Sequence, residues 1–193
     1  MTNTHTTLPT SLPTVIVDTR EQQPHHVFDG ALCNFRRCGL EVGDYALEDC
    51  CVPIPGRVTL RPSFAVERKS VSDWLSSWHG KRRDGKFWTA ADQRERLKIL
   101  KAKSLGFPLV YVIDGDRRQM YSALQREPWK RLCLRWEAVA YHIAYLRVRG
   151  VQVITAPTKD AAEETIIKLL MAWKDKRVPA NVSNDVSEGS AAE

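Results

Sequence analysis

Three short runs of β-branched and other apolar residues place the tightest limit on the fold of this chain. The runs are TVIVD (14–18), FPLVYVID (107–114) and VQVIT (151–155), and each has the length and composition of a buried strand. Helical patterns alternate with these runs along the sequence. Strands that alternate with helices predict an α/β fold, in which helices pack on a sheet that contains parallel strand pairs.

Two helices are expected after residue 128. Apolar residues recur at steps of three and four over 129–146, with Pro128 in the first turn and Gly150 just beyond the end. A second apolar stripe covers 166–173, and Asp160 with Glu163 resembles a capping box at its start. These patterns predict helices on either side of the third strand.

A further helix is expected from about Ala90 to Ser104. Its two leucines, Leu97 and Leu100, are expected to face inward, because apolar side chains of a helix normally turn to the core. Its basic residues are then expected to point largely to solvent: Arg94, Arg96, Lys98 and Lys101.

The length of 193 residues suits one domain. We expect disorder over 1–13, one folded domain over 14–177, and a disordered acidic tail over 178–193. No apolar run approaches the roughly 20 residues of a membrane-spanning helix, and the N-terminus lacks the pattern of a signal peptide. The five cysteines are an odd number and are too sparse for a disulfide scaffold. We therefore expect an intracellular protein, cytoplasmic in a prokaryote or virus and nuclear in a eukaryote.

Positive charge is concentrated in the expected domain. The whole chain carries +6, and its last 16 residues hold three acidic residues and no Lys or Arg, so residues 1–177 carry +9. A basic body favours a polyanion such as DNA as partner. One basic run lies close to Trp78, Phe87 and Trp88 and is either a solvated loop or a DNA-binding segment: Lys81, Arg82, Arg83 and Lys86.

The segment SFAVERKSVSDW (63–74) contains the residues with the clearest chemistry. An apolar run ends in Glu67, Arg68 and Lys69, and residues two apart on a strand project from the same face. Glu67 and Lys69 therefore point together, whereas Arg68 points away. A carboxylate beside an ammonium suits Mg²⁺-dependent phosphodiester hydrolysis, because the carboxylate binds the hard cation and the ammonium offsets charge on the phosphate. A surface ion pair is the plainer interpretation of these two residues alone.

Other acidic residues are available to complete such a site. Asp44 follows Gly43 at the start of an expected strand, and Asp18 ends the first strand. Asp73 also has a structural interpretation, because Ser70 three residues earlier makes it a capping residue at the start of a helix.

Taken in order, these elements resemble the signature of the XPF-type structure-specific nucleases of archaea and eukaryotes. The signature reads Asp-x-Arg-Glu, then Gly-Asp, then Glu-Arg-Lys, three residues and Asp. Here the elements are DTRE (18–21), GD (43–44), ERK (67–69) and Asp73. Four ordered elements match over about residues 14–175, which is much more specific than a lone Glu-x-Lys pair.

The resemblance implies a restriction-endonuclease-like fold, a mixed central sheet flanked by helices, in a single domain. It implies a metal-dependent endodeoxyribonuclease that uses Mg²⁺ or Mn²⁺ and hydrolyses DNA near single-strand to duplex junctions, such as flaps and forks, in repair or recombination. It also implies a homodimer formed through the last two helices, whose apolar faces include Trp136 and Trp173.

The resemblance further implies a role for each matching residue. Asp44 and Glu67 would be direct metal ligands, Asp18 would complete the acidic cluster, and Lys69 would be the catalytic lysine. Arg20 and Glu21 would organise the site or bind phosphate. Arg68 and Asp73 match signature positions with less defined roles.

Departures from the family pattern leave alternatives open. Family members commonly carry a tandem helix-hairpin-helix domain, which no segment after residue 177 is expected to form. The spacer between Asp44 and Glu67 is also long, and residues 50–56 suggest either a hairpin or a loop insertion there. One alternative is a Holliday-junction resolvase or a less selective nuclease on the same fold. Another is a non-catalytic DNA-binding subunit, although such subunits lose the acidic residues that are present here.

Overall fold

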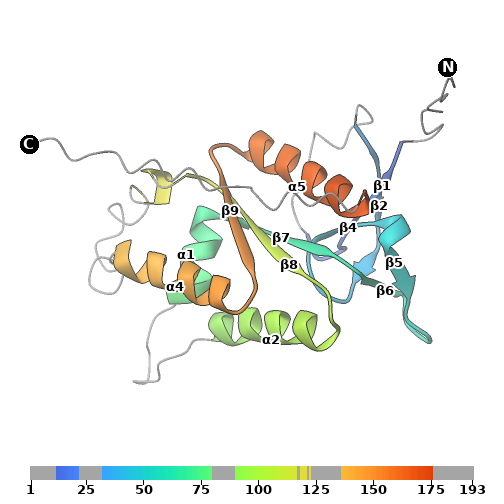
Figure 1. The fold of residues 1–193 in the computed structure, drawn as a ribbon, viewed down its shortest axis with the longest axis horizontal. Coiled ribbons are helices and arrows are strands. Elements are labelled where there is room, and N and C mark those ends of the chain that lie inside the picture. Colours follow the sequence, from blue (N-terminus) through green and yellow to red (C-terminus); the bar gives the residue numbers. More distant parts are fainter. Residues whose placement is uncertain are drawn as a thin grey trace, which may run out of the picture.

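A mixed six-stranded sheet forms the centre of the molecule (Figure 1). The computed structural model describes residues 12–21, 32–79, 90–116, 118–120, 122 and 136–175. In this part of the chain the strand order is β2-β1-β4-β7-β8-β9. The strands are β1 (Thr14–Val17), β2 (Asn34–Arg37), β4 (Tyr45–Leu47), β7 (Ala65–Ser70), β8 (Leu109–Asp114) and β9 (Gln152–Ala156).

Neighbouring strands of this sheet run both parallel and antiparallel. β1 is parallel to β2 and antiparallel to β4, β4 is antiparallel to β7, and β7, β8 and β9 are parallel to one another in turn. The three apolar runs of the sequence form β1, β8 and β9. The predicted α/β fold with parallel strand pairs is therefore confirmed.

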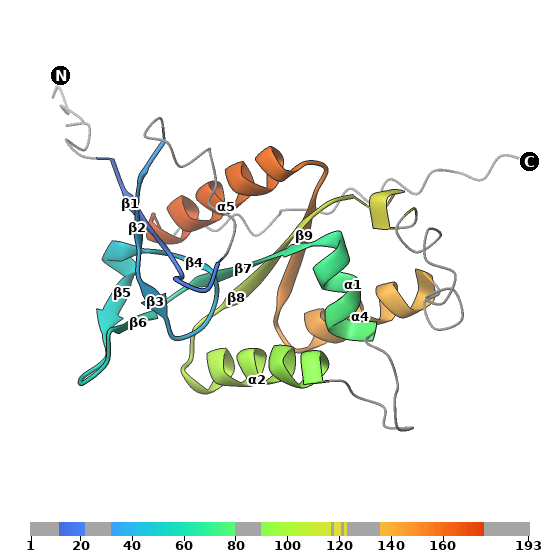
Figure 2. The ribbon, with the colours of Figure 1, turned by 180° about the vertical axis from the view of Figure 1, so that it is seen from behind.

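A second, three-stranded sheet lies beside the β1–β4 end of the main sheet (Figures 1 and 2). Its order is β3 (Gly39–Leu40), β6 (Thr59–Pro62) and β5 (Cys51–Pro53), and the short 3₁₀ helix η2 (Glu48–Cys50) precedes β5. β5 and β6 pair in antiparallel register. The long spacer between Asp44 and Glu67 thus contains the hairpin that the sequence suggests.

Helices cover both faces of the main sheet, as Figures 1 and 2 show from opposite sides. Helices α1 (Val71–His79), α2 (Ala90–Ser104) and α4 (Trp136–Val148) lie on one face, and α5 (Lys159–Lys174) lies on the other. Successive side chains of β8 point to opposite faces of the sheet and pack in two different cores, as the pleat of a strand requires. Tyr111 and Ile113 pack with α1 and α2, whereas Val110 and Val112 pack with α5.

Helix α2 forms over the expected residues but turns a different face to the core. Leu97 is 64% exposed and Leu100 is 51% exposed, whereas Ile99 and Ala102 are buried together with the acidic Glu95. The expectation that both leucines face inward is therefore wrong. The physical reason is that the buried face of α2 includes charged residues that pair with β7, which an apolar pattern does not reveal.

The ends of the last two helices refine the sequence interpretation. Helix α5 is capped by Thr158, whose hydroxyl accepts a hydrogen bond from the Ala161 N–H (3.1 Å), so the expected capping box at Asp160 is wrong by two residues. Gly150 has φ of +77° and its N–H donates to Arg147 O at 2.9 Å, as expected for a residue just past a helix. The expected start of α4 near residue 129 lies outside the described residues.

The apolar face of α5 is used within the chain. Ile166, Leu169 and Leu170 are buried in the core, and the Trp173 ring stacks on Phe64 with 5.0 Å between ring centroids. Trp173, which is expected from the sequence to contribute to a dimer interface, therefore already packs against Phe64 of the same chain. Among the described helices, none is both long enough and apolar enough to cross a bilayer.

Candidate active site

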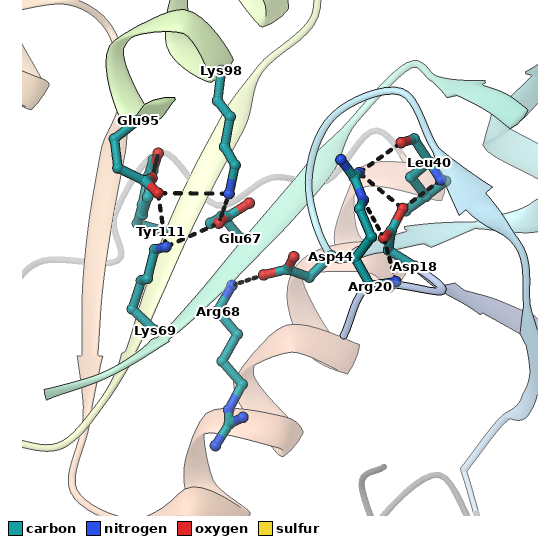
Figure 3. A network of polar contacts seen from close by, with 10 residues as sticks. All are labelled: Asp18, Arg20, Leu40, Asp44, Glu67, Arg68, Lys69, Glu95, Lys98 and Tyr111. Atoms are coloured by element: carbon teal, nitrogen blue, oxygen red, sulfur yellow. Dashed lines mark hydrogen bonds and ion pairs between the residues drawn. The ribbon is translucent and has the colours of Figure 1, made fainter. Parts of the chain in front are cut away.

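Strand β7 presents Glu67 and Lys69 together and turns Arg68 away, as its period of two requires. The Lys69 ammonium lies 3.3 Å from Glu67 Oε1. The Arg68 guanidinium instead pairs with Asp114, at 2.5 Å between Nη2 and Oδ2. Figure 3 shows the two directions along this strand.

Asp44 reaches the same place from the turn before β4. Its backbone N–H donates to Val66 O at 2.9 Å, and its carboxylate accepts a hydrogen bond from the Arg68 N–H at 2.8 Å. Gly43 makes this approach possible, because it has φ of +86° and a Cβ there would lie 2.7 Å from Ala65 Cβ. The turn therefore fixes Asp44 beside β7, where its carboxylate lies near Glu67 (Figure 3).

A polar cavity of about 660 Å³ contains these residues. It opens between β7, the turn at Asp44 and helix α2, and most of its lining is charged: Arg20, Glu21, Glu41, Asp44, Glu67, Arg68, Lys69, Asp73, Arg94, Glu95, Lys98 and Asp114. The structure thus brings into one cavity all the predicted site residues that it describes except Asp18.

The two central carboxylates differ from ordinary surface acids. Burial raises the pKa of Asp44, and the nearby negative charge of Glu67 raises it further. Glu67 is 2% exposed, and its buried Oε2 has no hydrogen-bond partner among the described residues. A buried carboxylate oxygen without a donor, next to a second carboxylate, is an arrangement that a cation stabilises.

Asp18 lies next to Asp44 in the fold, but both of its carboxylate oxygens already accept hydrogen bonds. Its two carboxylate oxygens accept hydrogen bonds from the Arg20 side chain (2.7 and 3.0 Å) and from the Leu40 N–H (2.6 Å). Burial opposes ionisation, but these donors outweigh it, so the pKa of Asp18 is lowered. No group of three or more acidic, His or Cys side chains suited to a metal is found in the described ranges, so a metal-ligand role for Asp18 stays a prediction.

Helix α2 adds two site residues that the sequence interpretation missed. Lys98, expected to point to solvent, forms an ion pair with Glu67 instead. Glu95 accepts a hydrogen bond from Lys69 Nζ at 2.8 Å through one oxygen and one from the Tyr111 hydroxyl at 2.7 Å through the other. Their spacing of three residues, with Ile99 and Ala102 on the same side, is the sequence signal that could have indicated this face.

The ammonium groups remain charged in this environment. Burial acts to lower the pKa of Lys69, but Glu67 and Glu95 outweigh it and raise the value. The same two carboxylates raise the pKa of Lys98 against the effect of burial. The cavity therefore contains fixed positive charges beside its acids.

The remaining predicted residues occupy the margin or lie outside the described part. Asp73 lines the cavity, and its N–H donates to Ser70 Oγ at 3.1 Å, which confirms the capping arrangement at the start of α1. Arg20 combines its bond to Asp18 with a largely exposed side chain. The expected DNA-binding run falls outside the described residues: Lys81, Arg82, Arg83 and Lys86.

The fold and the cavity together define the class of this protein. A mixed sheet flanked by helices, with Glu67 and Lys69 at the end of a central strand and Asp44 on a turn beside it, is a restriction-endonuclease-like fold. The chain belongs to the ERCC4 domain family, whose model matches residues 17–169.

A solved structure shows the same fold. The chain is similar to XPF from Aeropyrum pernix, with a TM-score of 0.54 and 19% sequence identity. The alignment covers 86% of this chain and 66% of that chain. No curated protein sequence matches.

Proposed function

We propose that this chain is a divalent-metal-dependent endonuclease that hydrolyses DNA phosphodiester bonds near junctions between single-stranded and duplex DNA. Its membership of the ERCC4 domain family and its XPF-like fold support a structure-specific nuclease in DNA repair. The observation that carries the metal-dependent step is the pair of Asp44 and Glu67, one with a raised pKa and the other with a buried oxygen that lacks a donor among the described residues.

These residues fit a hard divalent cation. Asp44 and Glu67 supply the carboxylate oxygens that Mg²⁺ and Mn²⁺ prefer, and they lie together in the cavity. When bound there, the ion would act as a Lewis acid that lowers the pKa of a bound water. Asp18 is better suited to orient Arg20, since both of its oxygens are already bonded.

The cationic side chains supply the electrostatic part of the reaction. Lys69 is held by Glu95 with its charge in the cavity, where it offsets negative charge that develops on a phosphate. Asp18 holds the Arg20 guanidinium through Nε and Nη2, and the exposed remainder of that group is placed to contact a neighbouring phosphate. Lys81, Arg82, Arg83 and Lys86 are proposed to follow the DNA backbone, and Asp73 to stabilise the start of α1 at the cavity margin.

Cleavage of defined substrates tests the proposed activity. The full chain is incubated with labelled flap, fork, Holliday-junction and plain duplex DNA in the presence of Mg²⁺ or Mn²⁺. We expect cleavage of branched substrates that is lost on chelation and in Glu67→Ala. Glu164→Ala is the matched control, because Glu164 is an exposed acid of α5 that pairs only with Lys168 among the contacts described.

The comparison of substrates also separates the alternatives. Cleavage of all four substrates at similar rates would indicate a less selective nuclease, and preference for the four-way junction would indicate a resolvase. Intact substrates together with tight DNA binding would indicate a non-catalytic subunit.

We also propose a homodimer through the α4 side of the molecule, where Val148 is exposed. A monomer in sedimentation at high protein concentration would contradict it.

A further inference from the structure

The metal-binding carboxylate proposed above already has a cation bound to it. Lys98 of α2 forms an ion pair with Glu67 Oε1, the same oxygen that lies 3.3 Å from Lys69 Nζ. Glu67 Oε2 has no partner in the described part of the chain. One oxygen of Glu67 is therefore shared by two ammonium groups while the other has none.

The two lysines differ in how firmly they are held. The Lys69 side chain is 13% exposed and lies 2.8 Å from Glu95, whereas the Lys98 side chain is 32% exposed. Lys98 also lies 3.6 Å from Glu95 Oε1, so it has a second carboxylate within reach on its own helix. Lys98 is thus the ammonium that can leave Glu67 at the smaller cost.

The charges in the cavity indicate a role for Lys98. Asp44, Glu67 and Glu95 place three carboxylates in the cavity, where Lys69 supplies a fixed positive charge, whereas Arg20 and Arg68 are paired with Asp18 and Asp114. Without a second cation, the buried Glu67 would be poorly compensated. Lys98 provides that cation from α2, and a divalent ion bound at Glu67 would provide the same compensation.

We propose that Lys98 is an internal counter-cation that occupies Glu67 in the metal-free protein and competes with the divalent ion for it. The proposal rests on the metal-dependent function proposed above. Because the ion would bind the same carboxylate through Oε2, which has no partner among the described residues, its positive charge favours movement of Lys98 away from Glu67 toward Glu95 or solvent. The bond stabilises the empty site and weakens its affinity for metal.

Calorimetric titration of Mn²⁺ into the full chain without DNA tests this competition. In Lys98→Met the dissociation constant should fall about tenfold, because a competing positive charge next to the ion is removed. The matched control is Lys101→Met, one turn further along α2, where the lysine pairs with Glu41 at 3.4 Å. Its dissociation constant should stay within about twofold of wild type, because that charge is screened by solvent and does not touch Glu67.

An unchanged or weaker affinity in Lys98→Met would overturn the proposal. If that variant does not fold, Lys98→Gln replaces it, since a neutral amide keeps a donor to Glu67 without the charge. Melting with and without Mn²⁺ is the second measurement. We expect the variant to melt lower than wild type without metal and to gain more from Mn²⁺, and an equal gain would contradict the competition.

The outcomes distinguish this proposal from the proposed function. Mn²⁺ binding that is lost in Glu67→Ala but unaffected by Lys98→Met leaves the nuclease site intact and removes the role of Lys98. Mn²⁺ binding that appears only in Lys98→Met supports the role of Lys98 while contradicting metal loading of the wild-type site. No binding in either protein contradicts both.

Discussion

Lys69 Nζ lies 2.8 Å from Glu95 Oε1 and 3.3 Å from Glu67 Oε1, so the closest anionic partner of this lysine comes from α2 and not from its own strand. Glu95 is buried and its other oxygen accepts a hydrogen bond from the Tyr111 hydroxyl. Tyr111 is the parallel register partner of Glu67 on β8. A chain of contacts from β8 through Glu95 therefore determines where the ammonium lies.

The first prediction concerns the position of Lys69. Glu95→Gln removes the charge that holds the ammonium, and displacement of a reacting group by about 1 Å can cost roughly 100-fold in rate. We expect kcat on a branched substrate to fall about 10- to 100-fold with KM little changed, because Glu95 does not contact DNA in the proposed mechanism. Single-turnover cleavage rates measure the change.

Tyr111→Phe is the matched control for Glu95→Gln. It removes one hydrogen bond to Glu95 and leaves its charge in place, so a smaller loss of about 2- to 10-fold is expected. An equal loss in the two variants would mean that the packing of β8, and not the charge of Glu95, governs the rate.

A second prediction concerns the glycine that brings Asp44 to β7. Gly43→Ala places a side chain at φ of +86° with its Cβ 2.7 Å from Ala65 Cβ. The backbone conformation costs about 1 to 2 kcal/mol and the overlap adds about 1 to 3 kcal/mol. The free energy of unfolding, measured in urea, should fall by the sum of these two costs.

Gly56→Ala separates the two costs of the glycine substitution. Gly56 has φ of +74°, and apart from its own chain neighbours no heavy atom lies within 4 Å of the position that a Cβ would take there. Only the backbone cost of about 1 to 2 kcal/mol is expected at this turn. Equal losses at both glycines would show that the turn at Asp44 shifts enough to remove the overlap with Ala65 at no further cost.

A third prediction links the proposed activity to stability. Burial and Glu67 raise the pKa of Asp44, so the folded chain holds a proton there more tightly than the unfolded chain does. The stability from this group is present below the unfolded pKa and is lost as pH rises through the folded pKa. At neutral pH and without metal, Asp44→Asn should therefore raise stability by about 1 kcal/mol while cleavage is abolished.

Thermal melting in chelator measures the effect of Asp44→Asn. The control is Asp160→Asn, which removes an exposed carboxylate from the first turn of α5 and should lower stability slightly through the helix dipole. A loss of stability in both variants would argue against a repulsive acid pair in the cavity.

A fourth prediction concerns Asp18, whose pKa shifts the other way. Burial opposes ionisation, but Arg20 and the Leu40 N–H overcome it and lower the pKa. The stability from Asp18 is then fully present above the unfolded pKa near 3.8 and is lost as pH falls through the lower folded value. Asp18→Asn should lose about 1 to 3 kcal/mol at pH 7, and the difference from wild type should shrink below about pH 4.

Urea unfolding across that pH range tests the role of Asp18. Asp49→Asn serves as the control, because Asp49 forms an exposed ion pair with Lys174 and should contribute at most about 1 kcal/mol. A difference between Asp18→Asn and wild type that stays constant with pH would show that shape, and not charge, makes Asp18 important.

The strands and the strand-borne site residues could be predicted from sequence because their signals are local. The runs at 14–18, 107–114 and 151–155 have strand composition, and they form strands. The opposite directions of Glu67 and Arg68 follow from the period of two. The turn at Gly43 and Asp44 is recognisable from its motif, although its geometry depends on Ala65, 22 residues later.

The contributions of α2 could not be predicted in the same way. Glu95 is buried and Lys98 is half-buried because they pair with Lys69 and Glu67 of β7, which lie 26 and 31 residues away in sequence. The apolar residues of α2 do not follow one stripe, since Leu97 and Leu100 lie on the exposed side and Ile99 on the buried side. An apolar pattern alone therefore selects the wrong face when a helix buries paired charges.

This reversed face leads to the fifth prediction. Ile99 is buried with Trp74 and Tyr111 in one core, and Ile99→Ala should cost about 2 to 4 kcal/mol in urea unfolding because it leaves a cavity there. Leu100 is the adjacent apolar residue and half of it is exposed, so Leu100→Ala should cost less than about 1 kcal/mol. If Leu100→Ala is the more costly change at high protein concentration and becomes mild on dilution, then a second copy of the chain covers that side of α2. A large cost at every concentration would instead mean that α2 turns its leucines inward, which would withdraw Glu95 and Lys98 from the cavity, because one helix cannot bury both faces against the same sheet.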